Sequence, residues 1–242
     1  MQILLFNLAA FAGACAQGMT GFGSGTLTAS LLVMLFPFRD VVATVAMLVL
    51  VPNLMLLWLT RHEMDWHRGP VAALGLSLGI VVGGQLLAIL PAELLRRGLG
   101  MAILVYVGLM LWRTPTPEQA PPRSVREGGF LFGSGAAAGV VVGAVGVSPI
   151  PLLIYVSLRY PKQIARSVLT LAFFCGTITQ NIVYYHLGLL TGELALMALL
   201  TVPGIALGLL VGNRLHYRIN QKTFARALAL ILLLPALRLV WG

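Results

Sequence analysis

Long stretches of the chain contain only hydrophobic and small or uncharged residues, and the charged residues lie between these stretches. A charge in the middle of a bilayer costs about 3 kcal/mol or more, so the charge-free stretches predict membrane-spanning segments. Several have the length of one transmembrane helix. We expect such helices at residues 41–60, 70–90, 94–112, 166–187, 193–213 and 222–241.

Two further apolar segments, residues 3–36 and 128–158, are too long for one span and too short for two. As single helices they would measure roughly 50 Å and 46 Å, whereas the hydrocarbon core is about 30 Å thick. Helix-breaking residues interrupt both, at 18–25 in the first and 143–151 in the second. We therefore predict that each segment forms two half-helices that meet at membrane depth, as a re-entrant hairpin or as one broken helix.

The two interrupted segments begin two copies of one unit. Offsets of 125 and 129 residues place residues of the first half on identical residues of the second. The aligned pairs include Gly18 and Gly143, Gly21 and Gly146, Gly79 and Gly208, Gly83 and Gly212, Arg97 and Arg226, and Trp112 and Trp241. The order of the segments also agrees. The sequence predicts two transmembrane repeats of about four helical segments each, at 1–113 and 128–242, joined by a polar linker at 114–127.

The distribution of Lys and Arg predicts the orientation of the repeats. If the first segment of each repeat is re-entrant, the repeats are inverted relative to each other. Of the 16 basic residues, 12 then lie on one side of the membrane, and the other side holds Arg39, Arg96, Arg97 and Arg238. Parallel repeats give a weaker bias. Basic residues concentrate in cytoplasmic loops, so inverted repeats are favoured, with both termini in the periplasm.

Composition excludes several classes of protein. The chain is 59% hydrophobic and 10% charged, with a mean hydropathy of +0.94, whereas soluble domains are about a quarter charged. The net charge of +9 is scattered between apolar stretches, so we expect no nucleic-acid partner. Cys15 and Cys175 lie in apolar segments without metal-ligand spacing, and no cofactor is expected. None of the seven acidic residues lies mid-span, and no catalytic grouping is present, so we do not expect an enzyme.

Breaks in membrane helices predict a binding site. Unpaired backbone groups persist in a membrane only where they are buried in protein or line a cavity, and the N-termini of half-helices favour anions. The alternative is that the glycines only allow close packing. We predict that a small anion contacts Thr20, Gly21, Phe22, Gly23, Ser24, Gly25, Gly146, Val147, Ser148 and Pro149.

Polar side chains within the spans are further candidates, because each needs a partner in the membrane. Asn53, Thr177 and Gln180 could complete the shell around the ligand or bridge helices, and the sequence leaves this open. Gln17 and Gln85 are weaker candidates of the same kind.

Other features have structural interpretations. Glycines spaced by four residues predict close helix packing and allow a homodimer; they are Gly75, Gly79, Gly83, Gly135, Gly139, Gly143, Gly204, Gly208 and Gly212. Trp112, Tyr184, Tyr185 and Trp241 lie near predicted span ends and are interpreted as aromatic belts. Residues 62–67 mix histidines and acids and are interpreted as a solvated loop.

The stretch Gly18-Met19-Thr20-Gly21-Phe22-Gly23-Ser24-Gly25 is similar to the glycine-rich Gly-Phe-Gly stretch that opens the first half in the sulfite exporter TauE/SafE family, also called the toluene sulfonate uptake permeases. Length, duplication and order of segments match over nearly the whole chain. The second half departs from the usual pattern, since Gly146-Val147-Ser148-Pro149 stands where the family commonly has a run of glycines before a proline. The resemblance implies transport of a small sulfur-containing anion, such as sulfite or an organosulfonate, across a bacterial inner membrane.

The sequence thus predicts an all-α polytopic membrane protein whose partners are the lipid bilayer and a small anion. The favoured function is secondary transport by alternating access. An anion channel of the same architecture and a non-transporting accessory subunit are the alternatives.

Overall fold

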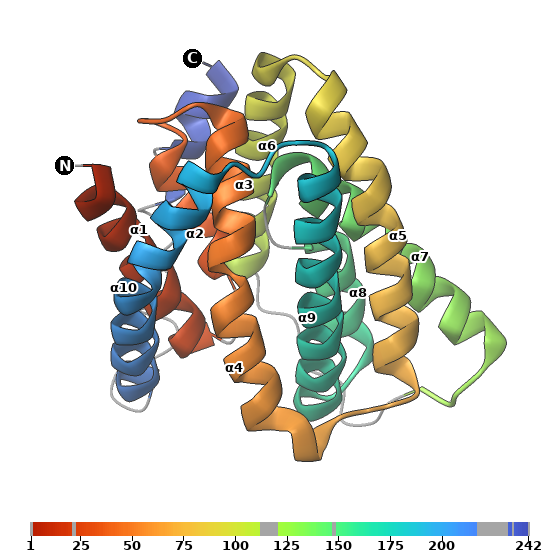
Figure 1. Ribbon diagram of the computed structural model, residues 1–242. Coiled ribbons are helices and arrows are strands. Elements are labelled where there is room, and N and C mark those ends of the chain that lie inside the picture. The colour runs from red at the N-terminus through yellow and green to blue at the C-terminus, as the bar shows by residue number, and fades with distance from the viewer. Residues whose placement is uncertain are drawn as a thin grey trace.

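A computed structural model describes residues 2–20, 23–111, 121–146, 149–216, 232–233 and 235–241, and this part of the chain contains helices and no strand (Figure 1). The elements are α1 (Gln2–Thr20), α2 (Ser24–Leu32), α3 (Phe38–Leu48), α4 (Leu50–Thr60), the 3-10 turn η1 (Arg61–Glu63), α5 (Arg68–Ile89), α6 (Ala92–Leu111), α7 (Val125–Val145), α8 (Ile150–Arg159), α9 (Lys162–His186) and α10 (Gly192–His216). Residues 235–241 are also helical. The predicted all-α architecture is confirmed for the described residues.

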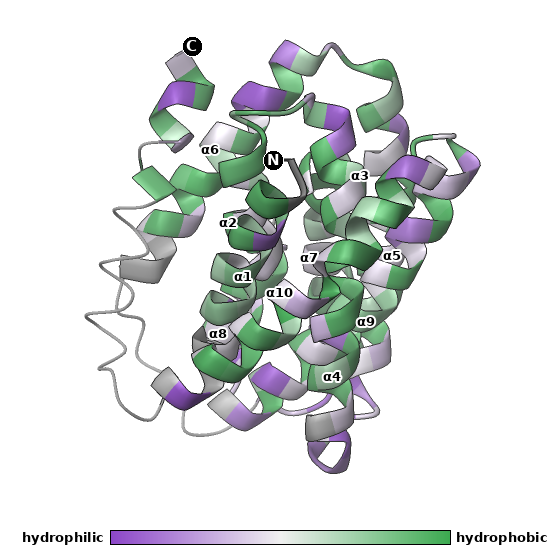
Figure 2. Cartoon of the chain, turned by 60° about the vertical axis from the view of Figure 1, so that its left-hand side comes forward, coloured by the Kyte–Doolittle hydropathy of each residue, from purple (hydrophilic) through white to green (hydrophobic). Residues whose placement is uncertain are grey.

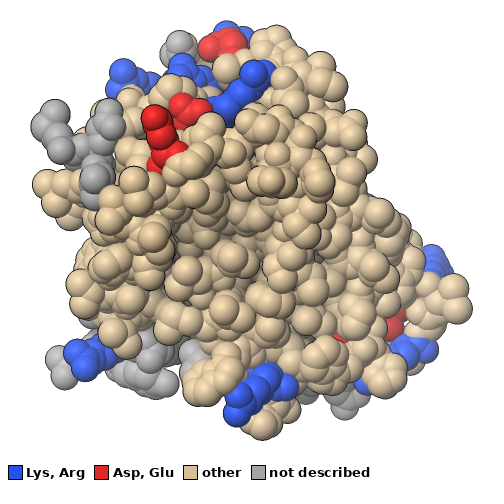
Figure 3. Space-filling view, in the orientation of Figure 1, with Lys and Arg blue, Asp and Glu red and all other residues tan. Residues whose placement is uncertain are grey.

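Five of the described helical segments are long and apolar enough to cross a membrane. They are Phe38–Trp58, Arg68–Ile89, Val125–Val145, Gln163–His186 and Gly192–Gly212. Hydrophilic residues gather toward the two ends of the bundle (Figure 2), and a wide band without charged residues separates these ends in the view of Figure 3. This distribution suits a bundle whose flanks face lipid.

The helices differ from the prediction in three respects. The helix expected at 41–60 is interrupted at Val49, because Pro52 has no N–H to offer the carbonyl of Leu48. Helix α7 begins at Val125, inside the predicted linker, where the Ser124 side chain accepts a hydrogen bond from the N–H of Glu127 at 3.1 Å. The interrupted segments are also unequal pairs: α1 and α7 have 19 and 21 residues, whereas α2 and α8 have 9 and 10.

The first interrupted segment is a hairpin that opens at the C-terminal end of α5. The rings of Phe6 in α1 and Phe36 beyond α2 lie 4.8 Å apart, so the two arms begin and end side by side. Arg39 follows directly and donates hydrogen bonds to the carbonyls of Ala88 and Leu90, at 3.0 and 3.1 Å. Both arms therefore meet the α5 end near residue 90.

The second interrupted segment, α7 and α8, opens at the opposite end of α5 (Figure 1). Arg68, the first residue of α5, donates to the carboxylate of Glu127 at the beginning of α7 at 2.6 Å. The hydroxyl of Tyr160, directly after α8, donates to the same carboxylate at 2.7 Å. The two hairpins thus enter the bundle from opposite ends and turn inside it.

Close glycine contacts join the hairpins to the long helices. A side chain at the α5 glycines would collide with carbonyl oxygens of α7, and one at the α10 glycines would collide with those of α1. The pairs are Gly75–Phe132, Gly79–Ala136 and Gly83–Val140, and Gly204–Asn7, Gly208–Phe11 and Gly212–Cys15. The packing role predicted for these glycines is confirmed. Offsets of 129 residues for the glycines and 125 for the carbonyls relate the two sets pair by pair.

An ion-pair network closes the end of the bundle where α5 begins. Arg68 is 7% exposed and also pairs with Asp65 at 3.1 Å. The interpretation of residues 62–67 as a solvated loop is therefore wrong for Asp65, whose side chain is 10% exposed. Burial alone would raise the pKa of the Asp65 carboxyl, but hydrogen bonds from the N–H groups of Arg68 and His67 and from the Arg68 guanidinium hold it below its ordinary value.

Candidate anion-binding site

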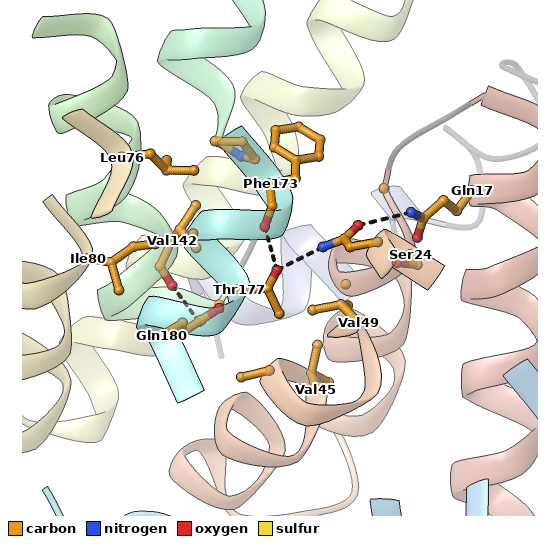
Figure 4. A pocket seen from close by; sticks show the side chains of 17 residues that line it. Gln17, Ser24, Val45, Val49, Leu76, Ile80, Val142, Phe173, Thr177 and Gln180 are labelled. Carbon is orange, nitrogen blue, oxygen red and sulfur yellow. Dashed lines mark hydrogen bonds between the residues drawn. The ribbon is translucent and has the colours of Figure 1, made fainter. Parts of the chain in front are cut away.

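A cavity of about 70 Å³ lies where the two chain breaks approach each other inside the bundle (Figure 4). A water molecule needs about 10–15 Å³ on this measure, so the cavity has room for a ligand of a few heavy atoms. Its lining comes from α1, α2, α3, α4, α5, α7 and α9 and from the residues of both breaks. The lining residues are Gln17, Gly23, Ser24, Gly25, Val45, Ala46, Val49, Asn53, Leu76, Ile80, Val142, Gly146, Pro149, Phe173, Gly176, Thr177 and Gln180.

Most of the described residues that the sequence predicts for the site line this one cavity. They are Gly23, Ser24, Gly25, Asn53, Gly146, Pro149, Thr177 and Gln180. Gly21, Phe22, Val147 and Ser148 lie outside the described residues, as does the side chain of Thr20. The structure therefore brings together candidates that are as far apart in the chain as Gly23 and Gln180.

At the first break, Gly23 has a φ of +96°, a conformation that glycine adopts without strain. A Cβ at this position would collide with the hydroxyl of Tyr106 in α6. The chain then enters α2, whose first helical bond runs from Leu27 N–H to the Gly23 carbonyl at 3.2 Å. The N–H groups of Ser24 and Gly25 precede this bond and have no acceptor within the helix, so they are donors at the cavity wall.

At the second break, Gly146 ends α7 with a φ of +71°. Pro149 precedes α8 and Pro151 stands in its first turn, and neither residue has an N–H. Helix α8 therefore offers fewer donors than α2. A Cβ on Gly25 would lie 3.7 Å from the Gly146 carbonyl oxygen, so the backbones of the two breaks are close neighbours.

A chain of hydrogen bonds crosses one side of the cavity (Figure 4). Gln17 Nε2 donates to Asn53 Oδ1 at 3.2 Å, and Asn53 Nδ2 donates to Thr177 Oγ1 at 2.7 Å. The Thr177 hydroxyl donates to the carbonyl of Phe173 at 2.7 Å. Asn53 and Thr177 thus bridge α4 and α9, which is one of the two roles that the sequence left open, and both also line the cavity.

Gln17 lines the cavity, although the sequence makes it a weaker candidate than Asn53, Thr177 and Gln180. It is 4% exposed, and its Oε1 has no hydrogen-bond partner among the described residues. In the sequence, Gln17 is identifiable as a polar residue within an apolar segment, and the same is true of Gln85. Gln85 lies at an exposed position of α5 and does not line the cavity. Sequence position alone does not distinguish these two glutamines.

Gln180 is held on the second half of the wall by backbone and side-chain contacts. Its Nε2 donates to the carbonyl of Val142 at 3.2 Å and to the hydroxyl of Tyr184 at 2.9 Å. The Tyr184 hydroxyl in turn donates to the carbonyl of Gly143 at 2.7 Å. The last turn of α7 is thus fastened to α9 beside the second break.

The aromatic-belt interpretation is wrong for Tyr184, which is fully buried by these contacts. Tyr185, the next residue, is 69% exposed, and Trp241 is 83% exposed, as a belt requires. Trp112 lies outside the described residues. Adjacent helix positions point about 100° apart, so one of two neighbouring tyrosines can face the interior while the other faces outward.

The apolar wall was not predicted. Val45, Val49, Leu76, Ile80 and Phe173 line the cavity, but nothing in the sequence separates them from the other apolar residues of the spans. Every described lining residue is uncharged. A ligand in the cavity would therefore contact backbone N–H groups, hydroxyls and amides against an apolar wall.

Comparison with known proteins agrees with this architecture. The family model described as "Sulfite exporter TauE/SafE" matches residues 5–239. The "Probable sulfite/organosulfonate exporter TauE" of Cupriavidus necator is 30% identical over 223 residues, which cover 89% of this chain and 84% of that protein. No solved structure matches the chain. The protein is thus a transporter rather than an enzyme, and it belongs to the sulfite exporter TauE/SafE family.

Proposed function

We propose that the protein transports a small sulfur-containing oxyanion, of the sulfite or short organosulfonate class, across the bacterial inner membrane, and that the cavity between the breaks is its binding site. The observation that carries the proposal is that both chain breaks, with their positive-φ glycines Gly23 and Gly146, border one small cavity. The relative from Cupriavidus necator is named an exporter, which supports outward transport.

Neutral groups hold the anion in this proposal. The N–H groups of Ser24 and Gly25 and the Ser24 hydroxyl point to the oxyanion, with the amides of Asn53 and Gln17 beside them. Oriented backbone dipoles favour a negative charge, but a second negative charge in an apolar, uncharged cavity is much more costly to bury. The singly charged forms, hydrogen sulfite and sulfonates, are therefore the favoured substrates.

Inverted repeats and alternating access complete the proposed mechanism. Three observations support them: the hairpins open at opposite ends of α5, the two sets of glycine contacts correspond pair by pair, and Asn53 and Thr177, which are 124 residues apart, bond to each other. If Asn53 and Thr177 are equivalent residues of the two repeats, they can bond to each other only near the axis that relates the repeats. If the repeats exchange conformations, a site on that axis opens to one side of the membrane and then to the other. In this arrangement both termini lie in the periplasm.

The experiment is uptake of labelled sulfite into proteoliposomes that contain the purified protein. We expect saturable uptake that methanesulfonate inhibits and chloride does not, with weak inhibition by toluenesulfonate because a ring exceeds the cavity. Uptake should follow the concentration of hydrogen sulfite as the pH changes near neutrality, while inhibition by methanesulfonate stays constant. Asn53→Leu should reduce uptake, and Gln85→Leu is the matched control outside the cavity.

The same experiment separates the alternatives. A conductance that does not saturate would indicate an anion channel. Folded protein without flux would indicate an accessory subunit and would contradict the proposal. Uptake that follows the concentration of the dianion would leave transport standing but would contradict selection by the neutral lining.

A further inference from the structure

A second cavity, of about 310 Å³, lies on the outside of the bundle where α7 begins. Its lining residues are Pro121, Pro122, Ser124, Arg126, Glu127, Phe130, Tyr155 and Arg159, none of which borders the candidate anion site. Lys or Arg side chains lie at this corner of the molecule, at the lower right of Figure 3, with Asp or Glu atoms between them; α7 begins there in the matching view of Figure 1. The cavity thus lies at the border between the charged end of the bundle and its apolar flank.

The charges in this cavity favour an anion. Arg126 and Arg159 line it, and neither forms an ion pair with an acidic residue of the described chain. The one acidic lining residue, Glu127, is already engaged by Arg68 at 2.6 Å and by the Tyr160 hydroxyl at 2.7 Å. Two guanidinium groups therefore remain for a ligand, and guanidinium suits the oxygens of a phosphate.

An open apolar surface continues from the arginines along α7. Gly129 and Gly133 follow Arg126 by three and seven residues, so all three lie on one face of the helix. A Cβ at either glycine would have no atom within 4 Å. The flanking Phe130 and Phe132 are 54% and 39% exposed, and the Arg126 guanidinium lies 5.9 Å from the centre of the Phe130 ring. An exposed apolar face of α7 therefore continues from the charged cavity.

We propose that this cavity binds the phosphate of an anionic phospholipid, with an acyl chain along the exposed α7 face at Gly129 and Gly133. Charge complementarity selects the headgroup, since Arg126 and Arg159 lie where the lipid phosphates of a leaflet would stand. The exposed apolar face selects a lipid over a free phosphate, because only a lipid covers the apolar surface beside the arginines. The site is independent of the proposed transport function.

The test is a lipid titration of the delipidated protein in detergent, read by native mass spectrometry. Each arginine near a membrane surface contributes roughly fivefold in affinity, so wild-type protein should bind phosphatidylglycerol about 30-fold more tightly than phosphatidylcholine. Arg126→Ala/Arg159→Ala should abolish the preference. Arg61→Ala/Arg214→Ala, which removes two exposed arginines elsewhere, is the matched control and should retain it.

Further variants keep the test decisive if the double alanine variant does not fold. Arg126→Gln and Arg159→Gln should each reduce the preference about fivefold, and Arg126→Lys/Arg159→Lys should keep most of it. Three results would overturn the proposal: equal binding of both lipids by wild-type protein, an unchanged preference in the arginine variants, or displacement of phosphatidylglycerol by an equal concentration of inorganic phosphate. The last result would identify a site for small anions.

Discussion

The two chain breaks share a backbone conformation but differ in chemistry. Each contains a glycine with positive φ, Gly23 in one and Gly146 in the other. The first break leads into α2, where Ser24 and Gly25 line the cavity and their N–H groups have no acceptor within the helix. The second leads into α8, where Pro149 and Pro151 remove donors. Among the described residues, the first break therefore offers more N–H donors to an anion than the second.

The neighbours of the two glycines differ as well. A Cβ at Gly23 would collide with the hydroxyl of Tyr106, which is 2% exposed. A Cβ at Gly146 would lie 2.9 Å from a methyl group of Val42, and a valine can shift slightly. The first break therefore tolerates less change than the second.

The largest expected effect comes from Gly23→Ala. A positive φ costs alanine about 1–2 kcal/mol at either break, and the collision with the Tyr106 hydroxyl at Gly23 adds more to this than the contact with Val42 at Gly146. We expect Gly23→Ala to lose most transport and to lower the melting temperature more than Gly146→Ala. Thermal unfolding in detergent and uptake in proteoliposomes measure both effects.

Removal of the Tyr106 hydroxyl provides the control for this comparison. Gly23→Ala/Tyr106→Phe should recover part of the melting temperature that Gly23→Ala loses. If Gly23→Ala and Gly146→Ala lower the melting temperature equally, the two breaks are equally constrained. This result would contradict the difference expected from the Tyr106 and Val42 contacts.

A second prediction concerns the hydrogen-bond chain from α1 to α9. Asn53→Leu removes the bonds to Gln17 and Thr177, whereas Thr177→Val removes only one of them. Interhelical hydrogen bonds in membranes contribute about 0.7 kcal/mol each, so we expect KM to rise about tenfold for Asn53→Leu and about threefold for Thr177→Val. Kinetics of sulfite uptake measure both KM values. A larger rise in KM for Thr177→Val than for Asn53→Leu would contradict this chain of hydrogen bonds.

A third prediction isolates the donor side chain of the first break. Ser24 lines the cavity, and α2 has no side-chain cap at Gly23. Ser24→Ala should weaken substrate affinity about fivefold, the value of one hydrogen bond, without a change in melting temperature. Substrate protection against thermal unfolding reports the affinity. Unchanged protection would remove Ser24 from the site.

The smallest effect is expected at the second break. Pro151→Ala returns an N–H to the beginning of α8. Because we propose that the donors of the first break hold the anion, KM should change by less than about twofold, within roughly 0.4 kcal/mol. A large gain in affinity would instead show that the second break holds the anion when it has the donors, and would remove the asymmetry between the breaks.

Much of the fold could be predicted because the membrane constrains hydropathy so strongly. The breaks before Ser24 and after Val145 lie inside the glycine-rich stretches, and α5, α6, α9 and α10 overlap the predicted spans. The candidate residues Asn53, Thr177 and Gln180 were identifiable because polar side chains are rare in spans. The burial of Tyr184 and the pairing of Asp65 with Arg68 were not, since both depend on neighbours distant in the chain.

The sequence by itself determined the helices, their breaks and the glycine contact faces, because these follow from local hydropathy, backbone freedom and residue size. Only the tertiary structure decided which elements meet. It brought Gly23 and Gly146 to one cavity, bonded Asn53 to Thr177, selected Gln17 over Gln85, and left Arg126 and Arg159 beside an open face of α7. These outcomes depend on how helices far apart in the chain pack, and the hydropathy of a single segment carries no information about its partner.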